Sequence, residues 1–166
     1  MGRASKKEDK SIYQLTREEC GLTREKASEQ IGFISADRIE KIENAKVNVQ
    51  PEDILALAEC YKAPNLCNHY CSHECPIGQQ HVPEVKFKDL SQIAIETLNA
   101  LNKMNREKER LLEIVEDGEI TPDEYTDFLE IKKTLDKISL SVDTLQLWLD
   151  QTIADGKIDK KAFKED

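Results

Sequence analysis

The sequence predicts an all-α protein with an N-terminal group of four or five short helices, a cysteine-rich connector and a C-terminal antiparallel two-helix hairpin. Three observations support this class. Residues 11–63 have no alternating strand pattern. The first two of their short apolar repeats end at glycines, and the second and third begin at capping residues. Residues 121–149 repeat apolar side chains in steps of three and four, which is typical of long packed helices.

The first two helices of the N-terminal group are each bounded by recognisable signals. The first covers about residues 12–20 and ends at Gly21. The second follows Thr23, a good N-cap, and ends at Gly32. The apolar residues expected to share an inward face are Ile12 and Leu15 in the first helix, and Leu22, Ala27 and Ile31 in the second.

The next two helices follow the same pattern. Ser35 can cap the third, and Pro51 begins the fourth. The inward residues expected here are Ile39 and Ile42 in the third helix, and Ile54, Leu57 and Ala58 in the fourth. Four packed amphipathic helices with short turns predict one small helical domain.

The hairpin is predicted from its ends and from its seam. One helix should run from about Asp89 to Asp117, before Gly118, and the second should open at Thr121-Pro122. The seam of the second helix consists of Phe128, Ile131, Leu135, Ile138, Val142, Leu145 and Leu149. This helix also has apolar residues outside the seam. They can pack on the N-terminal helices or on a second copy of the chain.

Composition and charge limit the partners. The chain has 166 residues, with 39% hydrophobic and 34% charged side chains, as expected for a soluble protein. No run is long enough to cross a membrane, and the first ten residues lack the apolar stretch of a signal peptide, so we expect a cytoplasmic protein. The net charge is +1 for residues 1–50 and −7 for residues 90–166. Only the first fifty residues therefore favour contact with a nucleic acid.

The segment from Ile12 to Ala63 resembles the Cro and phage-repressor type of helix-turn-helix domain, often called XRE-type. The residues that carry this resemblance are Arg17 before Gly21, then LTREKASEQIG, RIEKIENAK and PEDILALAECY. Turn, spacing and apolar pattern agree over four helices, about a third of the chain. The resemblance implies that the third helix enters the major groove of double-stranded DNA while the second crosses the backbone.

The resemblance also assigns roles to individual residues. It places Arg24 against a phosphate, and Asn44 and Lys46 on the DNA backbone. The residues that it places on the DNA-facing side of the third helix are Ala36, Asp37, Arg38 and Lys41.

The family pattern further implies an ion pair between Arg17 and Glu43. This chain departs from the pattern at a longer turn, GFIS, and at Ala45, where the family has a glycine and where alanine disfavours a left-handed cap. It also departs at the acidic residues of the third helix, since carboxylates near phosphates weaken DNA binding.

Four cysteines lie within sixteen residues and are candidate metal ligands: Cys60, Cys67, Cys71 and Cys75. In a reducing compartment such a cluster favours metal binding or redox chemistry over disulfides. On one straight helix the last three span about 12 Å, so a shared site requires the segment to bend, which Pro76 permits. Three alternatives stay open: an iron–sulfur cluster, a zinc ion with His69 or His73 as substitute ligands, or no metal at all.

These observations predict a DNA-binding transcription regulator that responds to metal or redox state and dimerises through the hairpin. The alternatives are a protein-interaction module with a helix-turn-helix fold that no longer binds DNA, and an iron–sulfur redox protein. Glycine-rich phosphate loops, nucleophile elbows and HExxH pairs are absent, so we expect no enzyme. The predicted domain limits are 1–10 (disordered tail), 11–63 (DNA-binding domain), 64–88 (connector), 89–155 (hairpin) and 156–166 (flexible tail).

Overall fold

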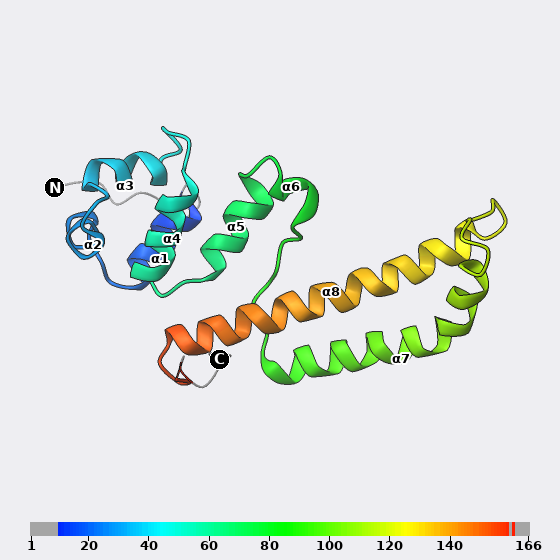
Figure 1. Cartoon of the computed structure of the whole chain (residues 1–166). Coiled ribbons are helices and arrows are strands. Elements are labelled where there is room, and N and C mark those ends of the chain that lie inside the picture. Colours follow the sequence, from blue (N-terminus) through cyan, green and yellow to red (C-terminus); the bar gives the residue numbers. More distant parts are fainter. Residues whose placement is uncertain (1–9, 160, 162–166) are drawn as a thin grey trace. The chain divides into compact units, whose positions relative to one another are not determined.

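The computed structural model describes residues 10–159 and 161 of the chain. Within these residues the protein is all-helical, with eight helices and no strand, as predicted. The chain divides into two compact units, which we call the N-terminal unit (Met1–Glu84 with Asp150–Asp166) and the hairpin unit (Val85–Leu149) (Figure 1). Most of the predicted tails, 1–10 and 156–166, lies outside the described residues.

The N-terminal unit begins with four short helices at the predicted places. They are α1 (Ile12–Glu19), α2 (Arg24–Ile31), α3 (Ala36–Glu43) and α4 (Pro51–Cys60). The predicted caps are confirmed: Thr23 accepts a hydrogen bond from the Lys26 amide and Ser35 accepts one from the Arg38 amide. Side-chain caps of this kind satisfy backbone donors that have no partner inside the helix.

Three of these helices end in the same backbone arrangement, a left-handed residue that closes two reverse hydrogen bonds. At the end of α1 this residue is Gly21, with φ 67°. After α3 it is Ala45 and after α4 it is Lys62, both with φ 52°. The hydrogen bond from the Lys46 amide to the Lys41 carbonyl, 2.8 Å, shows that the cap after α3 forms although alanine disfavours it.

The core of the N-terminal unit contains most of the predicted apolar residues. Ile39 and Ile42 of α3 and Ile54 and Leu57 of α4 are almost completely buried. In α1, however, Tyr13 and Arg17 are the buried residues, while the predicted Ile12 and Leu15 are only half-buried, and of these two Ile12 packs against the core. The apolar pattern therefore predicted the wrong inward face for α1, because it did not include the ion pair, described below, that holds Arg17 inside the domain.

The predicted connector contains two helices, α5 (Asn65–His73) and α6 (Gly78–His81), both in the N-terminal unit. Leu66 of α5 is fully buried in the core. Gly78 lies directly against the backbone of Cys71, since a Cβ atom at residue 78 would lie 2.0 Å from the Cys71 carbonyl oxygen. The absence of a side chain at Gly78 therefore allows α6 to fold back onto α5.

The hairpin unit consists of α7 (Leu90–Ile114) and most of α8 (Tyr125–Ala154), which run antiparallel (Figure 1). The α7 helix begins at the predicted place, where the Asp89 side chain caps it by accepting a hydrogen bond from the Gln92 amide. The α8 helix begins later than Thr121-Pro122, because the Glu124 carboxylate accepts hydrogen bonds from both the amide and the hydroxyl of Thr121 and holds a separate turn. Near this turn Arg110 of α7 pairs with Asp127 of α8, at 2.7 Å.

The predicted seam of α8 is divided in the structure. Ile131 is buried against α7, whereas Leu135, Val142 and Leu145 are 45%, 57% and 44% exposed. The remaining residues of α8 that are buried are mostly small and hydroxylated: Thr134, Ser141 and Thr144, together with Leu147. The seam is wider than one partner helix can cover, so α7 buries only one edge of it.

None of the described helices combines the length and the low charge that a membrane crossing requires.

Candidate nucleic-acid interface

The candidate interface is the outer face of α3, which the rest of the domain positions. Ile39 and Ile42 hold the opposite face of α3 in the core. Asp37, Lys41 and Asn44 are exposed on the outer face, and Ala36 at its start is half-buried. The helix therefore presents a short polar row away from the core, as a recognition helix must.

A buried ion cluster fixes α3 to α1 and α2. The Glu43 carboxylate receives hydrogen bonds from Arg17 Nε at 2.6 Å and from Arg24 Nε at 2.8 Å. Arg17 and Glu43 are 6% and 4% exposed. The hydrogen bond to Glu43 raises the pKa of Arg17, although burial opposes this. The pairing of Arg17 with Glu43 implied by the family resemblance is thus present, and Arg24 joins it instead of standing free.

Arg38 is also held inside the domain. Its guanidinium contacts both carboxylate oxygens of Asp53 at the start of α4, one of them at 2.9 Å from Nε. This hydrogen bond lowers the pKa of Asp53, although burial opposes the shift. Asp53 also accepts from the Gln50 amide and so completes the N-terminal cap of α4. The geometry gives Arg38 a role in joining α3 to α4.

The other residues predicted to contact DNA are also bonded to groups of their own domain. Lys41 Nζ lies 2.6 Å from Asp37 Oδ2, and Lys46 Nζ lies 3.3 Å from Glu40 Oε1. Asn44 donates to the Glu40 carbonyl at 2.8 Å and so caps its own helix. Pairs at the surface are weak, of the order of 1 kcal/mol or less, so a phosphate can displace these carboxylates at little cost.

Phe33 is a surface residue to which the sequence analysis gave no role. It lies in the turn between α2 and α3 and is 70% exposed. An aromatic ring at the entrance to a recognition helix can contact a thymine methyl group, as an alanine such as Ala36 also can. The signal was present in the unusual GFIS turn, where a phenylalanine follows Gly32.

The four clustered cysteines do not converge. Cys60 donates from Sγ to Gln30 Oε1, at 3.3 Å, and burial raises the pKa of its thiol. Cys67 and Cys71 lie one turn apart on α5, which stays continuous to His73. Cys75 follows the end of that helix, where its sulfur accepts from the Gly78 amide at 3.4 Å. In the part of the chain that the structure describes, no three His, Cys, Asp or Glu side chains form a group that could hold a metal ion.

The two histidines named as substitute ligands pack against each other. The rings of His69 and His73 are stacked with centroids 4.4 Å apart. Burial lowers the pKa of His69, and the neighbouring His73 adds to this effect. The Glu74 carboxylate, 3.9 Å from His69 Nε2, accepts a hydrogen bond from Tyr13 of α1 at 2.5 Å. This cluster therefore joins the end of α5 to α1.

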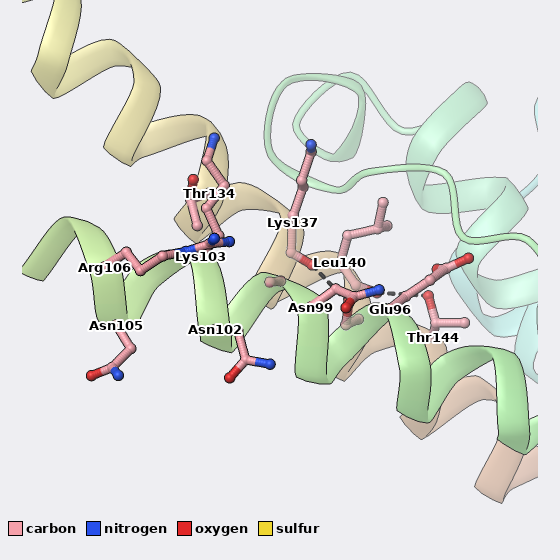
Figure 2. A pocket seen from close by; sticks show the side chains of 12 residues that line it. Glu96, Asn99, Asn102, Lys103, Asn105, Arg106, Thr134, Lys137, Leu140 and Thr144 are labelled. Atoms are coloured by element: carbon pink, nitrogen blue, oxygen red, sulfur yellow. Dashed lines mark hydrogen bonds between the residues drawn. The ribbon is translucent and has the colours of Figure 1, made fainter.

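A groove of about 940 Å³ runs along the hairpin between α7 and α8. Most of the residues that line it are polar by type, among them Asn, Lys and Arg, but the surface that they expose to the groove is more apolar than polar. Figure 2 shows Lys103 and Lys137 extending to one side of the helices, whereas Asn102 and Asn105 point to the other. These polar groups therefore do not meet at one point of the groove.

A comparison with protein families matched residues 14–66 to the family described as "Helix-turn-helix domain". The comparisons with curated proteins and with solved structures found no match. The matched segment contains all of α2, α3 and α4 and reaches into α5. Residues 14–66 of this protein, about a third of the chain, are therefore similar to a helix-turn-helix domain, the kind of domain that suggests a DNA-binding regulator.

Proposed function

We propose that the protein is a sequence-specific DNA-binding transcription regulator. The observation that carries this proposal is the outer face of α3, which is polar and exposed within the segment that matches a helix-turn-helix domain. In a complex, α3 lies in the major groove, with Lys41 and Asp37 toward base edges. A lysine can donate to guanine, and an aspartate can accept from cytosine.

The ion pairs described above determine the strength of this binding. Arg24 and Arg38 stay with Glu43 and Asp53, so Lys46 and Asn44 supply the main backbone contacts. Few phosphates are then neutralised, and the salt dependence is shallow. For one or two charged contacts, affinity falls roughly 3- to 12-fold between 50 and 200 mM salt.

The test is binding of the full chain to duplexes selected from a random pool at 50 mM salt, measured by fluorescence anisotropy. Lys41→Ala should weaken binding to the selected site about tenfold or more. Lys108→Ala removes the same charge from an exposed position on the hairpin and serves as the control. If no duplex is retained at 50 mM salt, or if both variants weaken binding equally, the proposal is wrong.

The pairing of cations with carboxylates favours one alternative, a helix-turn-helix fold that docks a protein. In that case the Asp37 and Glu40 carboxylates are permanent parts of the surface, and DNA binding stays absent even after both are changed to Asn and Gln. Gain of DNA affinity in the Asp37→Asn/Glu40→Gln variant would instead support the regulator.

Control by a metal or by redox state is a separate hypothesis. A site using all four clustered thiols requires this segment to rearrange, since Cys60 bonds to Gln30, Cys67 and Cys71 lie one turn apart on α5, and Cys75 follows the end of that helix. Its test is the content of iron, zinc and acid-labile sulfide in protein purified without oxygen. DNA recognition by α3 does not depend on the result.

We also infer that the regulator acts as a homodimer through the hairpin, because two copies present two recognition helices to paired half-sites on DNA.

A further inference from the structure

The turn between α2 and α3 carries a phenylalanine that is held outside the core by its neighbours. The amide of Gly32, a residue with φ 85°, closes α2 through a hydrogen bond of 2.9 Å. Ile34 is 2% exposed and belongs to the core cluster, and the Ser35 hydroxyl caps α3. Phe33 stands between these fixed residues and is 70% exposed. Ile34 takes the core side of the turn, so the Phe33 ring is left on the outside.

The place of Phe33 in the domain is more informative than its exposure, because single exposed apolar side chains are common on protein surfaces. In the described part of the N-terminal unit, the large apolar side chains that are exposed are Phe33, Leu55 and Ile77. Leu55 lies on α4, and Ile77 lies between α5 and α6. Phe33 lies three residues before Ala36, where α3 begins. The first residues of a recognition helix contact base edges, so Phe33 lies beside the expected base contacts.

The chemistry of a phenyl ring favours one group among those in the major groove. Base edges present hydrogen-bond donors and acceptors there, and their one apolar group is the 5-methyl group of thymine. A ring placed against a cytosine amino group or a guanine oxygen displaces water and returns no hydrogen bond, which costs binding energy. A ring placed against the thymine methyl group removes apolar surface of both partners from water. The ring of Phe33 therefore favours a base pair that contains thymine.

We propose that Phe33 is a specificity-determining residue, which requires thymine at the base pair that faces the turn between α2 and α3. This inference rests on the proposed function, because it needs α3 in the major groove. It adds a base requirement that the polar row of α3 does not supply. Asp37 and Lys41, which pair with each other at 2.6 Å, suit cytosine and guanine. Phe33 extends the recognised site to an A·T pair.

The contact made by Phe33 also differs from phosphate contacts in its response to salt. A phenyl ring has no charge and releases no counterions from DNA when it binds. The effect of Phe33→Ala on affinity should therefore be the same at 50 and at 200 mM salt. Lys46 is exposed and is expected to contact a phosphate, so the effect of Lys46→Ala should become smaller as salt increases.

The test uses the full chain and the duplex selected from a random pool, with each thymine replaced in turn by deoxyuridine, which lacks only the 5-methyl group. One replacement should weaken binding of the wild type about fourfold, as expected for one buried methyl group. The same replacement should have no effect in Phe33→Ala, which itself should bind at least fourfold more weakly than wild type. Leu55→Ala is the matched control: this residue is 63% exposed on α4, and the variant should keep both the wild-type affinity and the deoxyuridine effect.

Circular dichroism must show equal helix content in all variants. Phe33→Leu keeps a smaller apolar contact and should show an intermediate deoxyuridine effect, which provides the test if Phe33→Ala binds too weakly to measure. The inference is overturned if no thymine responds differently in wild type and in the Phe33 variants, or if Leu55→Ala removes the same effect. A duplex that is retained with either result contradicts only this inference. If no duplex is retained at all, the proposed function is wrong and this inference is wrong with it.

Discussion

The N-terminal unit and the hairpin unit are both helical, but the hairpin leaves many more of its large apolar side chains exposed. In the N-terminal unit, Ile34, Ile39 and Leu57 are at most 2% exposed and pack in one cluster. In the hairpin, Leu98 and Val142 remain more than half exposed. The N-terminal unit thus packs its apolar residues within itself, whereas the hairpin leaves apolar surface uncovered, which is the surface that the proposed dimer would use.

The largest expected effect lies in the N-terminal unit, at Glu43. Replacing it with Ala leaves Arg17 buried without its partner, which typically destabilises a protein by about 3–5 kcal/mol. Urea unfolding followed by circular dichroism should show early loss of the N-terminal unit while hairpin helicity persists. Glu40→Ala, which removes an exposed carboxylate of the same helix, is the control and should change stability by less than about 0.5 kcal/mol. Equal effects of the two changes would contradict the role of the buried cluster.

The next effect concerns the caps of the N-terminal unit. Ala45 has φ 52°, so Ala45→Gly relieves a left-handed strain and should stabilise the unit by about 1 kcal/mol. Gly21 has φ 67° and open space around it, so Gly21→Ala should destabilise by a similar amount. The midpoints of thermal unfolding measure both changes. If both variants shift the unfolding midpoint in the same direction, the backbone angle φ does not determine how much these caps stabilise the unit.

The caps and the core show what could be predicted from sequence. Thr23, Ser35 and Gly21 act locally, and their roles follow from residue type and neighbours. The partners of Arg24 and Arg38 could not be predicted, because Glu43 and Asp53 lie 19 and 15 residues away and meet them only in the folded domain.

The cysteine segment shows the same limit. Pro64 and Pro76 suggested a connector, but Pro64 stands at the start of α5, a position where proline is tolerated. Whether Cys67 and Cys71 share a site with Cys60 depends on tertiary packing, and spacing along the chain does not determine it.

A smaller effect depends on pH. The Arg38 hydrogen bond depresses the pKa of Asp53, so this pair stabilises the fold above the unfolded pKa of about 3.9 and is lost as pH falls through the folded pKa. Asp53→Asn should therefore be less stable than wild type at pH 6, by about 1 kcal/mol, with a smaller difference at pH 3. Urea unfolding at the two values measures this. Asp37→Asn, at an exposed site, is the control, and a difference that grows toward pH 3 would contradict the assignment.

The smallest effect is expected inside the hairpin. The Ser141 hydroxyl bonds only within α8, so Ser141→Ala should change stability by less than about 0.5 kcal/mol. Thermal unfolding of the variant and of wild type at one concentration checks this. A loss of several kcal/mol would mean that the hydroxyl makes a contact across the helices and that the hairpin core is more specific than described.

Hydrogen exchange of the full chain at two protein concentrations tests the contrast between the N-terminal unit and the hairpin unit most directly. Our account predicts that amides of α3 and α4 exchange at the same rate at 1 and 100 μM, while amides of α7 and α8 become more protected at the higher concentration. Equal protection of α7 and α8 at both concentrations would show that the hairpin is already complete within one chain and would contradict the account.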